Sequence, residues 1–352
     1  MRGMMRRLSV GWALVALFAI HGSEKALAAE PAPDLTVGIV SDIHLSRPAQ
    51  HKSQGAIDAF LRALGLFKEN SVDAIVIAGD LTNGGTADEL KITAECWEQV
   101  FGSLASGPEK VFVTGNHENN YSKEAKERWR EILHEPETPF FIKRVKGYAF
   151  VGAHWGHEAE LGAFLEAHRG ELAGSRPFFE VQHPHPRGTL YGKYSWGDDS
   201  GASTKALSAF PNAVSFSGHS HTSVALEASV WQGAFTAIGC SSLSYQTLFS
   251  RKGMLNVSEY RRPQDPRYRA ASSRSREGLI VTVYDSCLVI ERREFVRRAK
   301  LGPDWVVPLP YEPARAEFSY AAERRRLRSP AFPKGAKLAI ARGGEFIELK
   351  LP

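Results

Sequence analysis

Residues that can bind metal ions follow the predicted strands of this chain five times, each time shortly after a short apolar run. The segments are Asp42-Ile43-His44 after Leu35–Val40, Gly79-Asp80 after Ala74–Ala78, Gly115-Asn116-His117-Glu118 after Lys110–Val113, His183 after Pro177–Gln182, and Gly218-His219-Ser220-His221 after Val214–Ser217. In open α/β sheets, ligands bind at the carboxyl ends of the strands. We therefore expect these loops, although far apart in sequence, to converge on one site.

The residue types in these loops predict a metal centre. Carboxylates and imidazoles together suit Mn, Fe and Zn, and Gly79, Gly115 and Gly218 would let the backbone turn sharply near an ion. In the two motifs with alternating ligands, D-x-H and H-x-H, we expect extended backbone that projects both side chains to one side. The expected ligands are Asp42, His44, Asp80, Asn116, His183, His219 and His221.

One of these ligands has a competitor. The run His183-Pro184-His185-Pro186 offers two imidazoles. His183 directly follows the strand pattern, so we favour it, and His185 remains the alternative.

The order of the predicted elements indicates an α/β layered fold. Helical patterns at Gly55–Phe67 and Thr86–Leu104 alternate with the first strands, and later strands fit Ala234–Ile238, Leu279–Tyr284 and Leu288–Glu294. After residue 300 the chain becomes rich in Pro, with short β-like pieces. We therefore predict a main domain over residues 29–300 and a small C-terminal β-rich segment over residues 301–352.

The N-terminus has the pattern of a secretory signal peptide over residues 1–28. Arg2, Arg6 and Arg7 precede the apolar stretch Val10–Ile20, and small residues follow at Ala26–Ala29. We expect a periplasmic or secreted protein that meets the membrane only through this peptide. An uncleaved anchor is the alternative, and the choice between Sec and twin-arginine export stays open.

The net charge argues against a nucleic-acid-binding protein, and the cysteine spacing argues against a disulfide-rich or zinc-finger protein. Removal of residues 1–28 takes away four basic residues and one acidic residue, so the net charge falls from +5 to +2. We therefore expect no nucleic-acid polymer as a partner. The three cysteines are widely spaced, which indicates neither a disulfide framework nor a zinc finger.

The set D-x-H, G-D, G-N-H-[DE], H and G-H-x-H resembles that of the calcineurin-like metallophosphoesterase superfamily, over roughly Leu35 to His221. The resemblance implies a four-layer fold, in which helices flank a two-sheet β-sandwich. It also implies two metal ions, Mn and/or Fe, with Zn as an alternative. The implied roles are Asp42, His44 and His221 on the first ion, Asn116, His183 and His219 on the second, Asp80 bridging both, and His117 as a catalytic residue that binds neither.

The implied chemistry is phosphoester hydrolysis. Two neighbouring cations clamp a phosphate and turn a bridging water into hydroxide, which attacks phosphorus, while His117 assists the leaving group or the transition state. The expected substrate is a small phosphodiester or phosphomonoester, with contacts from Arg47, His185 and Tyr191. Asn83 stands where purple acid phosphatases place a metal-binding Tyr, so the chain looks more like the phosphodiesterase branch.

Two other functions remain open on the sequence alone. A non-catalytic exported binding protein would keep a vestigial phosphoesterase domain and bind a glycan or another partner through its C-terminal tail. A metal-dependent hydrolase or lyase would act on a group other than phosphate, because a fold does not dictate its substrate. Seven intact candidate ligands favour the enzyme over the binding protein.

Overall fold

The computed structural model describes residues 32–46, 52–119, 128–191, 196–247, 249–250, 253–254, 275–313, 339–343 and 346–350. Residues 33–352 belong to one compact unit. The predicted signal peptide and Arg47 lie outside the described residues. Across the described ranges, no helix combines the length and the apolarity that a membrane crossing requires.

The first sheet carries the strands that precede the D-x-H, G-D and G-N-H-E motifs. Its strands are β1 (Leu35–Val40), β2 (Ala74–Ala78), β3 (Glu109–Val113), β12 (Glu277–Tyr284), β13 (Cys287–Glu294), β14 (Ala299–Lys300) and β15 (Trp305–Pro308). Their order is β14-β13-β12-β1-β2-β3, and β15 also pairs with β13. β1, β2 and β3 run parallel, so their carboxyl ends lie at the same edge.

The second sheet carries the strands that precede His183 and the G-H-S-H motif. Its strands are β4 (Phe140–Val145), β5 (Tyr148–Ala153), β6 (Phe178–Gln182), β7 (Ala213–Ser217), β8 (Val230–Gln232) and β9 (Thr236–Gly239). Their order is β4-β5-β6-β7-β9-β8. The four central strands β5, β6, β7 and β9 run parallel, which brings the loops after β6 and β7 together.

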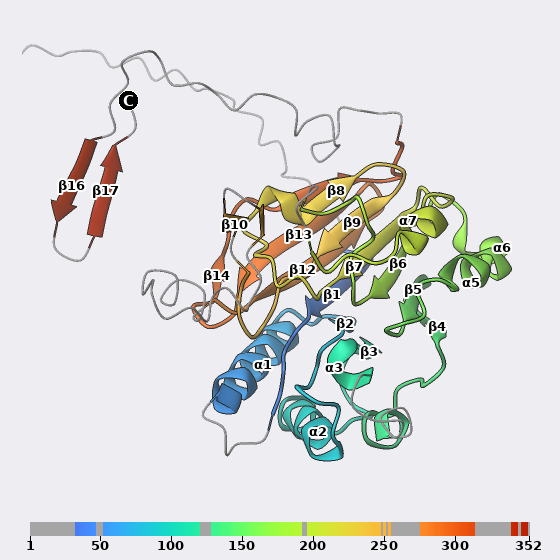
Figure 1. Cartoon of the computed structure of the whole chain (residues 1–352), viewed down its shortest axis with the longest axis horizontal. Coiled ribbons are helices and arrows are strands. Elements are labelled where there is room, and N and C mark those ends of the chain that lie inside the picture. The colour runs from blue at the N-terminus through green and yellow to red at the C-terminus, as the bar shows by residue number, and fades with distance from the viewer. Residues whose placement is uncertain are drawn as a thin grey trace, which may run out of the picture. The chain divides into compact units, whose positions relative to one another are not determined.

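Helices cover the outer faces of both sheets. The helical elements of the described residues are α1 (Lys52–Glu69), α2 (Ala87–Phe101), α3 (Asn116–Asn119), the π-helical turn η1 (Trp129–Leu133), α5 (Leu161–Ala167), α6 (Arg169–Leu172), α7 (Ala202–Leu207) and the 3-10 turn η3 (Glu227–Ser229). α1 and α2 lie beside the first sheet, and α5 and α7 beside the second (Figure 1). Two small hairpins complete the described elements, β10 (Phe249–Ser250) with β11 (Gly253–Met254) and β16 (Ala339–Gly343) with β17 (Phe346–Lys350).

Three apolar clusters hold these layers together. The central cluster joins the inner faces of the two sheets and includes Val37, Val76 and Phe216. An outer cluster packs α1 and α2 on the first sheet, and a third packs α5 and α7 on the second. The result is helix, sheet, sheet, helix, which confirms the predicted α/β sandwich.

Two local features of the sequence support the packing and the start of these helices. Gly38 leaves room on β1 for Phe67 of α1, because a Cβ at Gly38 would lie 2.5 Å from Phe67 Cγ. α2 begins with a capping box in which Thr86 and Glu89 satisfy each other's backbone N–H groups.

The structure departs from the predicted elements in several places, including the unpredicted α7 and β8. The strand β4 was not predicted, and it lies at the edge of the second sheet, where Lys143 and Arg144 interrupt the apolar pattern. Trp305–Pro308, beyond the predicted domain boundary at residue 300, pairs with β13 and is part of the first sheet.

Candidate metal centre

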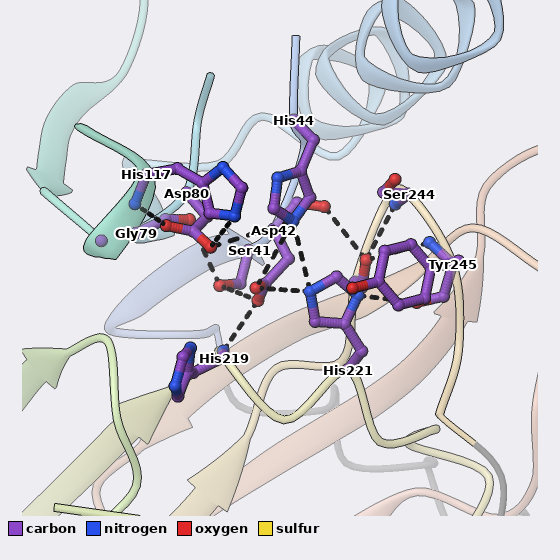
Figure 2. Close-up of polar contacts among 12 residues, drawn as sticks. Ser41, Asp42, His44, Gly79, Asp80, His117, His219, His221, Ser244 and Tyr245 are labelled. Carbon is purple, nitrogen blue, oxygen red and sulfur yellow. Dashed lines mark hydrogen bonds and ion pairs between the residues drawn. The ribbon is translucent and has the colours of Figure 1, made fainter. Parts of the chain in front are cut away.

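The loops after the parallel strands of both sheets bring six of the seven predicted ligands together, and Figure 2 shows five of them, Asp42, His44, Asp80, His219 and His221. The seventh, Asn116, begins α3 directly before His117. Three groups of donor atoms form there, and within each group the atoms lie within 4.8 Å of one another. The groups are Asp42 with His44 and His221, His44 with Asp80 and His117, and Asp80 with His183 and His219. Asp80 and His44 each belong to two groups, and the first and third groups join donors from the two sheets.

The backbone of these loops is left-handed. The φ angles are 51° at Asp42, 53° at His44, 52° at Asp80, 64° at His219 and 52° at His221. The prediction of extended backbone in the D-x-H and H-x-H motifs is therefore wrong, although both pairs do reach the cluster. Positive φ is uncommon outside glycine and often marks functional sites.

Backbone carbonyls orient three of the imidazoles. Nδ1 of His183 lies 2.7 Å from Ala78 O, Nδ1 of His221 lies 3.0 Å from Tyr245 O, and Nδ1 of His117 lies 2.7 Å from Asn83 O. A carbonyl only accepts, so each Nδ1 donates its proton and, in the neutral ring, Nε2 keeps a lone pair. Metal-binding histidines are commonly oriented in this way.

The cluster contains buried acceptor atoms that have no hydrogen bond. Asp42 Oδ1, Asn116 Oδ1 and His183 Nε2 are the three such atoms among the predicted ligands. His221 Nε2 lies 2.9 Å from Asp42 Oδ1, and His183 Nε2 lies 3.2 Å from Asp80 Oδ2. Two donors about 2.1 Å from one ion lie roughly 3 Å apart. The unsatisfied atoms and their spacing therefore fit metal ions.

Two glycines let the loops approach each other. A Cβ at Gly115 would collide with Asp80 Oδ1, and a Cβ at Gly218 would collide with Ser41 Oγ and Asp42 Oδ2. The predicted close passage of the backbone at these positions is confirmed.

The electrostatics of the cluster favour a bound cation. Burial alone would raise the pKa of Asp42, but His221 and His183 outweigh it and lower this pKa to about 2. Burial would likewise raise the pKa of Asp80, and His183 lowers it far below its usual range. Burial opposes charge on His183, yet Asp80 and Asp42 raise its pKa to about 10. The same carboxylates that hold this proton would attract a metal ion.

Two further histidines of the cluster stay neutral near pH 7. Burial, aided by His221 and His117, lowers the pKa of His44 to about 4 against the pull of Asp80. Burial and then His183 lower the pKa of His219 to about 3. Neutral imidazole is the form that binds metal ions.

Glu118 holds the loops of the first sheet in place. Its Oε2 accepts from Asp80 N at 3.1 Å and from Gly115 N at 2.8 Å, while Oε1 accepts from Thr82 N and Thr82 Oγ1, both at 2.8 Å. Burial and then Asp80 raise its pKa to about 7, against the hydrogen bonds that favour the carboxylate. Glu118 thus ties the loop after β2 to the loop after β3.

Two of the predicted substrate contacts lie inside the protein. His185 is buried next to Tyr191, with ring centroids 5.1 Å apart, and belongs to none of the three donor groups. The Tyr191 hydroxyl is hydrogen-bonded to the side chains of Ser220 and Ser229. Their burial does not support direct substrate contact. It suits a role in positioning the loop between His219 and His221, and Arg47 lies outside the described residues.

Three aromatic residues beside the cluster were missed as site residues. Tyr245 stacks on His221 with ring centroids 3.9 Å apart (Figure 2). Trp155 lies 5.1 Å and Trp196 lies 5.3 Å from the ring of His219. Tyr245 comes from a serine-rich stretch with no strand-end pattern, so no signal in the sequence identified it. The available signals were that Trp155 follows β5 and that Trp196 lies in the glycine-rich loop after His183, which could form a substrate lid.

Comparisons with known proteins agree with this geometry. Residues 35–223 match the family described as calcineurin-like phosphoesterase. No curated protein matches the chain.

Two solved structures share the fold. One is a dimetal phosphatase from Danio rerio, at 11% identity and a TM-score of 0.50, covering 80% of this chain and 100% of that chain. The other is the purple acid phosphatase PPD1 from yellow lupin seeds, at 12% identity and a TM-score of 0.52, covering 86% of this chain and 58% of that one. At these identities the likeness shows the fold alone.

Proposed function

The chain belongs to the calcineurin-like phosphoesterases, a family of metal-dependent enzymes, and from this membership we propose that it hydrolyses a small phosphoester at the strand-end cluster. The observation that carries the proposal is the position of Asp80. Its Oδ2 lies 3.8 Å from Nε2 of His44, a proposed ligand of the first ion, and 3.2 Å from Nε2 of His183, a proposed ligand of the second, as a carboxylate that bridges two ions would.

Each ion would have its own set of ligands. Asp42, His44 and His221 would hold the first ion, and Asn116, His183 and His219 the second. Asp80 would bind both. The proposed ions are Mn or Fe, with Zn as the alternative, because the donors are carboxylate, amide and imidazole. When bound, such ions polarise the phosphoryl group and lower the pKa of water.

His117 would carry a proton for the leaving group. Its Nδ1 donates to Asn83 O, and its Nε2 faces the cluster, 3.9 Å from Asp80 Oδ2. Its side chain is 28% exposed, whereas those of Asp42 and His183 are fully buried. A substrate would therefore reach His117. As an imidazolium, His117 would pass the Nε2 proton to the departing oxygen.

We further propose that the enzyme works outside the cytoplasm and prefers a diester. The N-terminal pattern of a signal peptide supports export. Asn83, at the position of the purple-phosphatase Tyr, supports a phosphodiesterase-like branch.

The test is an assay of the purified protein on bis(4-nitrophenyl) phosphate and 4-nitrophenyl phosphate, with added Mn²⁺, Fe²⁺ or Zn²⁺. We expect hydrolysis that a chelator abolishes and added metal restores, with the diester preferred. The variant Asp80→Asn tests the cluster directly. Its matched control is Asp304→Asn, which changes only a surface ion pair with Lys300. A folded, metal-loaded protein that hydrolyses neither ester would refute the proposal.

A further inference from the structure

The cluster is partly accessible. The side chains of Asp42 and His183 are fully buried, whereas His44 is 10% and His117 is 28% exposed. Asn116 and His219 are also half-buried. A substrate must therefore arrive over these partly exposed residues, and the side chains around them will meet its ester groups.

Two tryptophans border this opening at His219. Trp155 follows β5 and Trp196 precedes α7, yet both rings contact the same imidazole. Trp155 also lies 5.6 Å from the ring of His183. Both tryptophans are half-buried residues, although the indole nitrogen of Trp196 is itself buried.

Their orientation differs from that of Tyr245 on the other side of the cluster. Tyr245 lies nearly flat on His221, with an interplanar angle of 27°. The indoles of Trp155 and Trp196 are inclined to His219 by 58° and 65°. The two indoles therefore meet His219 at an angle and do not lie flat on it.

The backbone of both tryptophans is held in place. Trp155 N donates to Thr114 O at 3.3 Å, and His154 Nδ1 in turn accepts from Thr114 N at 3.0 Å. Next to Trp196, Gly197 has a φ of 82°, and a Cβ there would lie 2.9 Å from His219 Cδ2. A fixed aromatic surface loses little entropy when a ligand binds.

We propose that Trp155 and Trp196 form an aromatic subsite, which binds a planar ring on the ester group that the substrate retains after hydrolysis. This proposal rests on the proposed phosphodiesterase function. A nucleobase and an aryl group share the required chemistry, a flat π surface that stacks on indole. The subsite would select esters by this ring, while the metal cluster acts on the phosphate.

The test compares three diesters that share the 4-nitrophenolate leaving group and differ only in the retained ester group. These groups are methyl, phenyl and thymidine 5′. We expect kcat/KM for at least one ring-bearing ester to exceed that for the methyl ester by roughly tenfold. A higher value for thymidine identifies a nucleobase site, and a higher value for phenyl alone identifies an aryl site.

The variants assign that preference to the two tryptophans. In Trp155→Leu with Trp196→Leu, the ratio of ring-bearing to methyl ester should fall towards one. Trp231→Leu is the matched control, because Trp231 is a half-buried indole that packs on Phe235, and the ratio should not change. A ratio near one in the unchanged protein, or an unchanged ratio in the double variant, would overturn the subsite.

A binding measurement separates failure of this proposal from failure of the proposed function. If the metal-loaded protein hydrolyses none of the diesters, the phosphoesterase assignment fails. Calorimetry with phenylphosphonate and methylphosphonate still tests the subsite in the unchanged protein. If a leucine variant does not fold, this binding measurement alone decides whether the subsite exists. We expect phenylphosphonate to bind roughly tenfold more tightly, and equal affinities would contradict the subsite.

Discussion

The two sheets contribute different chemistry to the candidate centre and hold it by different means. The first sheet supplies both carboxylates, Asp42 and Asp80, and its loops are tied by the buried carboxyl group of Glu118. The second sheet supplies only imidazoles, and buried carboxyl groups also tie its loops, since Asp199 accepts from Arg187 N and Glu277 accepts from Val224 N. The comparison indicates that Glu118 acts directly on the backbone of the ligand Asp80, whereas the carboxyl groups of the imidazole half bind the backbone farther along its loops.

The largest stability effect should come from the first sheet. Glu118→Gln replaces one carboxylate oxygen by an NH₂ group, which cannot accept the backbone N–H groups now bound there. We expect a loss of about 2 kcal/mol or more in the free energy of unfolding, measured by denaturant titration, with weaker metal binding. Glu137→Gln, at a surface pair with Arg130, is the control and should change little. Equal stability of the two variants would remove the proposed role of Glu118.

The corresponding change on the second sheet should be milder. Tyr191→Phe removes the hydroxyl that binds Ser220, and should cost about 1 kcal/mol of stability. Metal affinity should fall by about tenfold, as it does when a residue that orients ligands is lost. Titration calorimetry with Mn²⁺ measures this.

Tyr311→Phe provides a matched control for Tyr191→Phe. The Tyr311 hydroxyl donates to Gly233 O at 2.8 Å, far from the donor groups along the second sheet. We expect a similar loss of stability and unchanged metal affinity. If both variants bind metal as the unchanged protein does, Tyr191 is a packing residue only.

The features of the site that could be predicted from the sequence are those that depend on residues close together in the chain. The strand-end positions of Asp42, Asp80 and His183 were predictable, since a short apolar run precedes each. The fold also followed from the order of strands and helices. The left-handed backbone at Asp42 and His221 was not predictable, because it depends on contacts between loops that meet only in the folded chain.

The supporting residues show the same limit. Tyr245 orients His221 from 24 residues away in the sequence, and its neighbours have no metal-binding pattern. Tyr191 was predicted to contact substrate, because a glycine-rich loop suggests exposure. The folded chain buries its ring, and this burial depends on distant residues such as Gly239, which makes room for its hydroxyl.

A pH-dependent effect is expected from a buried acid on the second sheet, outside the cluster. Burial raises the pKa of Glu180 from 4.5 to about 8, although Ser215 donates a hydrogen bond to it. The folded protein therefore holds a proton that the unfolded chain releases between these pH values, and stability falls as the pH rises from 4.5 to about 8. Glu180→Gln should flatten this dependence. Melting temperatures that fall equally with pH in both proteins would contradict it.

The central claim is that a single carboxylate, that of Asp80, serves two metal ions, and elemental analysis of purified protein tests it most directly. We predict two metal ions per chain in the unchanged protein, and loss of both in a folded Asp80→Asn variant, because each ion loses a charged ligand. Loss of one ion with full retention of the other, or two ions retained, would contradict the shared site.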